Sequence, residues 1–137
     1  MRRSRIVAAL LTFIFAFSAM SPASATPTKT FTSGYNMIYQ VYGSTTFGVT
    51  KNNSVSVTIN QNSGASTLYY VTIERQTCGT FGCSWKGNTQ GGVCERTVSN
   101  TTPKTCNFTA SISDRLHRVV LRKVNDGERV KGEISVK

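Results

Sequence analysis

CGTFGCSWKGNTQGGVCERTVSNTTPKTC, residues 78–106, holds all four cysteines and the single tryptophan of this 137-residue chain. The cysteines follow the spacing C-x4-C-x10-C-x11-C, whereas zinc sites of four cysteines usually carry paired C-x2-C knuckles. Because an exported chain meets oxidising conditions, its cysteines are expected to pair with one another. The stretch therefore predicts a small β domain held by disulfides.

Hairpin geometry favours one pairing of the four cysteines among the possible connectivities. Cys78 and Cys83 flank four residues, so they can lie opposite each other across a tight hairpin. Cys94 and Cys106 are equidistant from Asn100, the centre of a turn-like segment, and can do the same. We expect Cys78–Cys83 together with Cys94–Cys106; the alternative nests Cys83–Cys94 inside Cys78–Cys106.

The N-terminal residues predict export. Residues 1–5 are cationic, residues 6–17 are apolar, and Ala23-Ser24-Ala25 matches an A-x-A cleavage site. We expect a signal peptide over residues 1–25 and a secreted protein. A membrane anchor would need about 20 consecutive apolar residues, and polar residues interrupt this run sooner. No later segment is apolar and long enough to span a bilayer, so we expect no transmembrane segment after the leader.

The remaining chain is the size of one domain and is basic. From Thr26 onward it has 112 residues, with 13 Lys and Arg against 6 Asp and Glu, a net charge of +7. We expect a flexible arm over residues 26–33 and one domain over residues 34–137. This charge favours an anionic surface as partner, although simple solubility is the alternative reading.

Alternating apolar residues predict strands along the chain. Residues 54–60 alternate strictly, and residues 68–76 follow after turn chemistry, so the two are expected to form an antiparallel hairpin. Residues 116–124 and 129–136 flank Asn125-Asp126-Gly127 and predict a second hairpin. The inward side chains of these segments are Val55, Val57, Ile59, Tyr69, Val71, Ile73, Val119, Leu121, Ile134 and Val136.

Further strands complete an all-β pattern. Residues 35–42 place Tyr35, Met37, Tyr39 and Val41 on one side of an extended segment, and a short strand is expected within residues 47–50. Cys106, Phe108 and Ala110 share an inward face of another strand. The chain thus predicts a disulfide-stapled β-sandwich of about seven antiparallel strands, with a small closed β-barrel as the alternative.

Two sets of residues are candidates for binding. Trp85 and Lys86 open a Gly-rich loop that extends to Gly92, where an aromatic ring could stack on a sugar or lie at a membrane interface. A core tryptophan packed on a disulfide is the alternative, and the general burial of tryptophan favours it. Arg118 and Arg122 are expected to line the solvent side of their strand, in a stripe shared with two valines, Val120 and Val124. An edge strand protected by charge is the simpler explanation of that stripe.

The sequence offers little for catalysis. His117 is the only histidine, and Asp114 would face the opposite way on a strand. Asp126 and Glu128 lie together at a turn and are most simply solvated. A metal site is not expected, because the cysteines are consumed in disulfides and a single imidazole cannot hold a metal ion. We therefore expect no enzyme, no metal and no cofactor. Nucleic acid is also not expected as a partner, because no nucleic-acid-binding motif occurs.

Two classes of function remain. The first is a secreted, non-catalytic binding or structural module that acts at a cell surface, a wall polymer or an extracellular protein. An inhibitor of an extracellular enzyme is a special case, with the ring segment Gly79–Gly82 as its contact loop. The alternative is a membrane-active cationic antimicrobial protein or toxin, in which aromatic side chains insert into anionic lipid.

Overall fold

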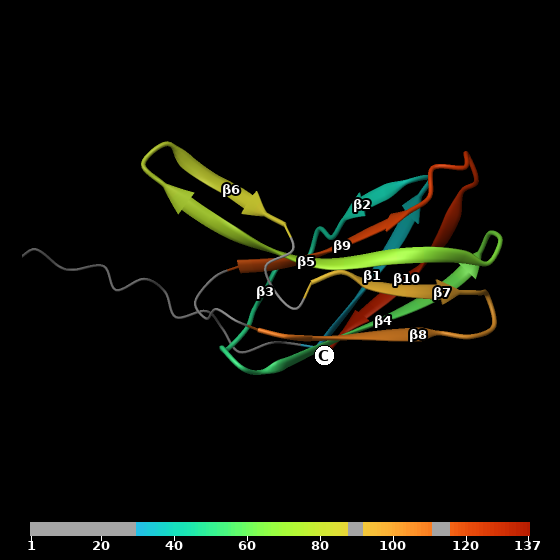
Figure 1. Cartoon of the computed structure of the whole chain (residues 1–137), viewed down its shortest axis with the longest axis horizontal. Coiled ribbons are helices and arrows are strands. Elements are labelled where there is room, and N and C mark those ends of the chain that lie inside the picture. Colours follow the sequence, from blue (N-terminus) through green and yellow to red (C-terminus); the bar gives the residue numbers. More distant parts are fainter. Residues whose placement is uncertain (1–29, 88–91, 111–115) are drawn as a thin grey trace, which may run out of the picture.

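The computed structural model describes residues 30–87, 92–110 and 116–137, which form strands and connecting turns only (Figure 1). The strands are β1 (Phe31–Met37), β2 (Gln40–Tyr42), β3 (Phe47–Gly48), β4 (Ser54–Ser63), β5 (Thr67–Gly79), β6 (Gly82–Lys86), β7 (Cys94–Val98), β8 (Lys104–Thr109), β9 (Leu116–Lys123) and β10 (Val130–Val136). The predicted all-β, disulfide-stapled fold is confirmed.

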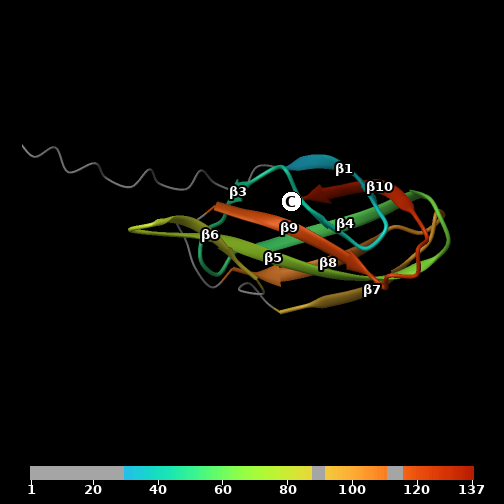
Figure 2. The same cartoon turned by 90° about the horizontal axis from the view of Figure 1, so that it is seen from above.

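The strands form two antiparallel sheets that pack as layers, visible in Figure 2. The four-stranded sheet has the order β1-β10-β4-β8. In the six-stranded sheet β9 pairs with β2, β3 and β5, and β5 also pairs with β6 and β7. Because the ladders fall into two separate sheets, the sandwich describes the fold and the closed barrel does not.

The alternation read from the sequence locates the core correctly. On β4, Val55, Val57 and Ile59 are buried, and their counterparts on β5 face them from the other sheet. Cys106 and Phe108 of β8 are buried as predicted, and so is Ala110 directly after the strand. Phe47 at the start of β3 confirms the short strand expected there. A period of two therefore identifies which side chains face the space between the sheets.

Both predicted hairpins are wrong. Strand β4 pairs with β8 and β10, whereas β5 lies in the opposite sheet. In the same way β9 and β10 belong to different sheets, although the turn Asn125-Asp126-Gly127 joins them. In each case the chain crosses between the layers, so the inward faces of the two strands meet across the core and not side by side. Sequence alternation is the same for both arrangements, because it reports only burial on one face.

The N-terminal prediction also needs correction. Phe31, Thr32 and Ser33 pair with β10 and so belong to β1, not to a flexible arm; residues 26–29 and the expected signal peptide lie outside the described residues. The segment 35–42 is not one strand. Tyr35 and Met37 are buried at the end of β1, whereas Tyr39 is 47% exposed where the chain crosses to β2 in the other sheet.

A buried chain of hydrogen bonds connects the two sheets. The Tyr69 hydroxyl on β5 donates to Gln61 Oε1 on β4 at 2.8 Å and lies 3.0 Å from the Tyr35 hydroxyl on β1. Burial raises the pKa of both tyrosines, so the hydroxyls keep their protons. Gly132 makes room for this cluster, since a Cβ there would lie 2.6 Å from the Tyr35 hydroxyl oxygen. The polar groups are thus satisfied inside the apolar core.

A buried lysine closes one end of the sandwich. The Lys123 side chain points inward, and its ammonium donates to the Asp126 carboxylate and to the carbonyls of Ile38, Val124 and Glu128. These acceptors come from the β1–β2 and β9–β10 crossings. The sequence suggested that the turn with Asp126 is simply solvated, and this is not the case. Lys123 connects this turn to the β1–β2 crossing.

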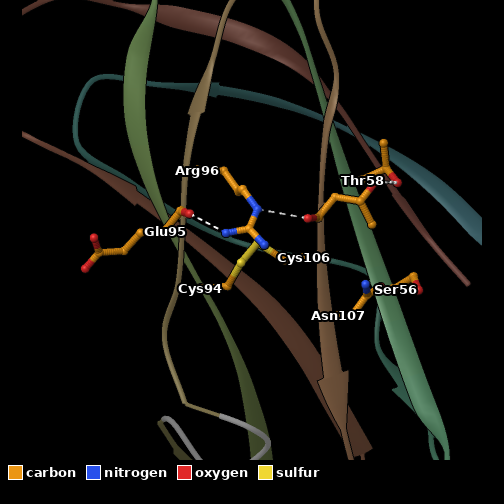
Figure 3. The surroundings of a disulfide bond; sticks show 8 residues. Ser56, Thr58, Cys94, Glu95, Arg96, Cys106 and Asn107 are labelled. Atoms are coloured by element: carbon orange, nitrogen blue, oxygen red, sulfur yellow. Dashed lines mark hydrogen bonds between the residues drawn. A yellow bond between two sulfur atoms is a disulfide. The ribbon is translucent and has the colours of Figure 1, made fainter.

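The expected disulfide pairing is confirmed. Cys78 and Cys83 are directly opposed on β5 and β6, in the hairpin that the spacing predicted. Cys94 and Cys106 also pair, but β7 and β8 lie in different sheets. Figure 3 shows this second bridge beside Arg96 of β7, which donates to the carbonyls of Glu95 and of Thr105 on β8. The second disulfide therefore joins the two layers at one edge of the sandwich.

Candidate binding surface

The outer face of the six-stranded sheet brings together side chains from four strands. Across the strands, Arg122 of β9 lies opposite Gln40 of β2 and Tyr70 of β5. Closer to the projecting end of β5, Arg118 lies opposite Glu74. These positions alternate with the buried ones along each strand, so they all point away from the core. The face is therefore a candidate surface for contact with a partner.

Three side chains on this face form a stack, called here the aromatic–arginine strip: Tyr42, Arg118 and Trp85. The Arg118 guanidinium carbon lies 4.2 Å from the centroid of the Tyr42 ring and 4.4 Å from that of Trp85. Arg118 Nε and Nη2 donate to Glu74 Oε2 at 2.9 and 2.7 Å. Cation–π contact and a charge-assisted pair thus hold the guanidinium. The strip fastens the base of β6 to the sheet, and Arg118 has little capacity left for a ligand.

Trp85 is not the core tryptophan that its residue type favoured. It is half-buried on β6 and lies outside the hydrophobic core. Among the described residues, strand β6 pairs only with the far half of β5, which extends beyond the sandwich (Figure 1), and no opposing sheet of that part of the chain covers its side chains. The Trp85 ring instead packs on the Arg118 guanidinium, so these two predicted binding residues are in contact with each other.

The predicted basic and aliphatic stripe holds only in part. Val120 points outward but is fully buried, because it lies between Tyr42 and Thr72 on the neighbouring strands and between two arginines along its own strand. Val124 is 56% exposed and Arg122 is exposed. The outward face of β9 is thus a covered patch at one end and an open basic and apolar patch at the other.

A groove of about 320 Å³ occupies the open end of this face. Its lining residues are Tyr39, Tyr70, Thr72, Val93, Arg122, Lys123 and Val124. The ammonium of Lys123 is directed into the protein, so Lys123 lends the groove little charge. Arg122 takes part in neither of the ion pairs found in the described part of the chain. Within these residues, the groove therefore combines one unpaired guanidinium with exposed aromatic and aliphatic walls.

The remaining predicted binding residue, Lys86, lies apart from the groove. It is exposed at the end of β6, opposite Arg75 of β5. The Gly-rich loop that follows it falls largely outside the described residues, which resume at Gly92. The four predicted binding residues thus divide among the strip, the groove and the projecting hairpin.

His117, the histidine weighed for catalysis, does not reach this surface. His117 is fully buried between the sheets, with its ring 5.9 Å from that of Phe47, and Asp114 lies outside the described residues. In the described ranges, no three His, Cys, Asp or Glu side chains gather as a metal site would require. Those ranges also contain no helix that is long and apolar enough to cross a membrane.

The sequence missed several residues of this surface. Tyr39, Tyr42, Tyr70, Glu74 and Val93 contribute to the strip or the groove. The alternation of β5 could have placed Tyr70 and Glu74 on its outer face, but only the pairing of β5 with β9 brings them to the arginines. No known protein family, curated protein sequence or solved structure matches this chain.

Proposed function

We propose that this protein is a secreted, non-catalytic module that binds an acidic polysaccharide at an extracellular surface through the groove on its six-stranded sheet. The observation that carries the proposal is the exposed Arg122 guanidinium, unpaired within the described chain, in a groove walled by Tyr39 and Tyr70. A planar guanidinium suits carboxylate groups because it can donate two parallel hydrogen bonds.

The walls of the groove suit the rings of a sugar. Tyr39 is 47% exposed and Tyr70 is half-buried on the strand beside Arg122. Aromatic rings offer an apolar face to a sugar ring and a hydroxyl to its polar groups. The apolar side chains of Val93 and Val124, both about half exposed, extend the same surface. A chain with alternating apolar faces and acidic groups would therefore match the groove better than a small anion.

The charge and the disulfides support an extracellular role. The chain carries a formal net charge of +10, and a net +7 after the expected leader, which attracts polyanions at long range. Two disulfides in a small domain are compatible with an extracellular location. The signal-peptide pattern of residues 1–25 supports export.

The test compares one groove variant with one matched charge variant. Arg122→Gln removes the guanidinium from the groove, and Lys131→Gln removes an exposed charge from β10 in the other sheet. Binding to polygalacturonate is measured by calorimetry, with neutral dextran as the control polymer. We expect Arg122→Gln to weaken binding roughly tenfold or more, as for the loss of a charge-assisted hydrogen bond, and Lys131→Gln to change it little.

Two results would count against the proposal. Equal losses in the two variants would mean that the polymer senses only the total charge of the protein. Binding of dextran as tightly as polygalacturonate would remove the role of the acidic groups. In either case the groove would not be the recognition site for an acidic polysaccharide.

A further inference from the structure

The hairpin of β5 and β6 projects from the sandwich and ends in an exposed aromatic side chain. Both views show this ribbon extending away from the two layers (Figures 1 and 2). Phe81 in its turn is fully exposed, with a relative accessibility of 105%. The neighbouring residues 78–80 and 82–84 are exposed as well, so this part of the ribbon packs against nothing in the described structure. An apolar ring so placed contributes nothing to the core.

The ribbon holds this ring on a stiff support. The turn consists of Thr80 and Phe81, and Gly82 after it takes a φ of +119°, which favours glycine. One pair below the Gly79–Gly82 pair, Cys78 and Cys83 are directly opposed and joined by a disulfide. At the base, Trp85 stacks on Arg118. Contact at the tip would therefore order little additional chain, which lowers the entropic cost of binding.

The charge of the ribbon has one sign. Residues 75–87 contain Arg75 and Lys86 and no Asp or Glu. These two basic residues occupy directly opposed positions on β5 and β6, four residue pairs from the Gly79–Gly82 pair. At about 3.4 Å per residue, they lie roughly 14 Å from the Gly79–Gly82 pair that closes the hairpin. The ribbon thus combines an apolar tip with a basic collar at a fixed distance from it.

We propose that this hairpin tip docks on anionic lipid bilayers, with Phe81 inserted at the boundary between headgroups and acyl chains. Interfacial segments insert about 5–10 Å into this region, which leaves Arg75 and Lys86 near the level of the lipid phosphates. A deeper position is unfavourable because the edges of a two-stranded ribbon carry unpaired backbone groups. This function is separate from polysaccharide binding in the groove.

A bilayer suits the tip better than a protein partner does. A specific protein interface typically buries about 800 Å² on each side, whereas the tip offers one large apolar side chain. A bilayer accepts a single inserted ring and adds an attraction for every basic residue near its surface.

The experiment measures partitioning of the protein onto phosphatidylcholine vesicles with and without phosphatidylglycerol, at low and high salt. Phe81→Ser removes the ring from the tip. Ile38→Ser is the matched control, since Ile38 is 38% exposed at the opposite end of β9, beside Lys123. All variants carry the same N-terminus, determined by mass spectrometry, so the leader cannot explain a difference between them.

We expect binding to the anionic vesicles to fall roughly tenfold in Phe81→Ser, as for the loss of one buried aromatic ring, and to stay unchanged in Ile38→Ser. A double variant, Phe81→Trp with Trp85→Phe, moves the only tryptophan to the tip. Its fluorescence should shift to the blue with anionic vesicles and be quenched by brominated acyl chains.

Equal binding of wild type and Phe81→Ser would overturn the proposal, as would an unshifted tryptophan at position 81. No vesicle binding by the wild type would also overturn it and would turn attention to an apolar pocket on a protein. The groove is tested independently: Arg122→Gln, added to the Phe81→Trp/Trp85→Phe variant, should retain the blue shift at the tip, and Phe81→Ser should retain binding to polygalacturonate. Failure of one proposal is thus distinguishable from failure of the other.

Discussion

The two disulfides have the same chemistry and different structural roles. Cys78–Cys83 closes the free end of the β5–β6 hairpin, where both cysteines are exposed. Cys94–Cys106 connects β7 to β8 across the sandwich, and Cys106 is fully buried (Figure 3). The second bridge joins the two layers, whereas the first joins only the two strands of the projecting ribbon. A crosslink in a part that can unfold locally is therefore expected to contribute less to global stability than one that joins the two sheets.

The largest effect is expected from removing the bridge between the layers. In Cys94→Ala/Cys106→Ala the unfolded chain regains the freedom of a loop of 12 residues' separation, and a small cavity replaces buried sulfur. We expect the free energy of unfolding to fall by about 3 kcal/mol. Urea denaturation followed by circular dichroism measures this change. An unchanged midpoint would mean that the remaining contacts between the sheets carry the coupling by themselves.

A second connection between the layers is the hydroxyl chain in the core. Tyr69→Phe removes the donor to Gln61 Oε1 and leaves a buried acceptor unpaired, so we expect a loss of roughly 1–3 kcal/mol. Tyr35→Phe is the matched control, because Tyr69 can still donate to Gln61 in that variant. Denaturant titration of both variants checks the order. A greater loss in Tyr35→Phe would contradict the position of Tyr69 as the central member.

The third connection is the hydrogen-bonded ion pair between Lys123 and Asp126, and its contribution to stability depends on pH. The hydrogen bond from Lys123, and then that from the Glu128 amide, lower the pKa of Asp126 below its ordinary value of 3.8. The folded state therefore binds this proton less tightly than the unfolded state does. The contribution of Asp126 to stability is complete above pH 3.8 and is lost as the pH falls through the lower folded pKa.

Asp126→Asn should therefore reduce stability at neutral pH and flatten its decline below about pH 4. Melting temperatures of wild type and variant across the acid range measure the difference. Glu128→Gln serves as the control, since the Glu128 carbonyl and not its carboxylate accepts from Lys123. Parallel acid curves for wild type and Asp126→Asn would contradict the role of this carboxylate.

The smallest global effect is expected at the hairpin tip. Cys78→Ser/Cys83→Ser frees a crosslink of only 5 residues' separation, in a ribbon that can fray by itself. We expect a loss of less than about 1 kcal/mol, because the variant can lose the tip locally while the sandwich stays folded. Amide hydrogen exchange should speed up in β6 and stay unchanged in β4. A loss as large as that of the other bridge would show that the ribbon supports the core.

The sequence predicted burial, secondary structure and disulfide pairing well, for reasons that are local. Side chains alternate across any extended strand, so apolar periodicity revealed the inward faces of β4, β5 and β8. The four-residue spacing between Cys78 and Cys83 suited a tight hairpin, and the structure confirms that pairing over the nested alternative. The pairing of Cys94 with Cys106 was predicted correctly for an incomplete reason, since the same central turn leads from one sheet into the other.

The candidate sites depended more strongly on contacts distant in sequence. Arg122 and Trp85 could be singled out as a basic and an aromatic residue, but their surroundings could not. Their neighbours in the strip and the groove come from several strands and from the segments beside them, which are distant in sequence and are brought together by the strand register of the six-stranded sheet. Phe81 likewise became a candidate only because the hairpin extends beyond the opposing sheet and leaves the tip uncovered.

By itself the sequence determined an all-β, disulfide-linked domain and the side chains of its core, because alternation and spacing act over a few residues. Only the tertiary structure decided that the turns after β4 and β9 carry the chain from one sheet to the other. A crossing and a hairpin present the same alternating pattern, and the choice depends on which inward faces pack together. That choice created the groove around Arg122 and left the β5–β6 ribbon free to project from the sandwich.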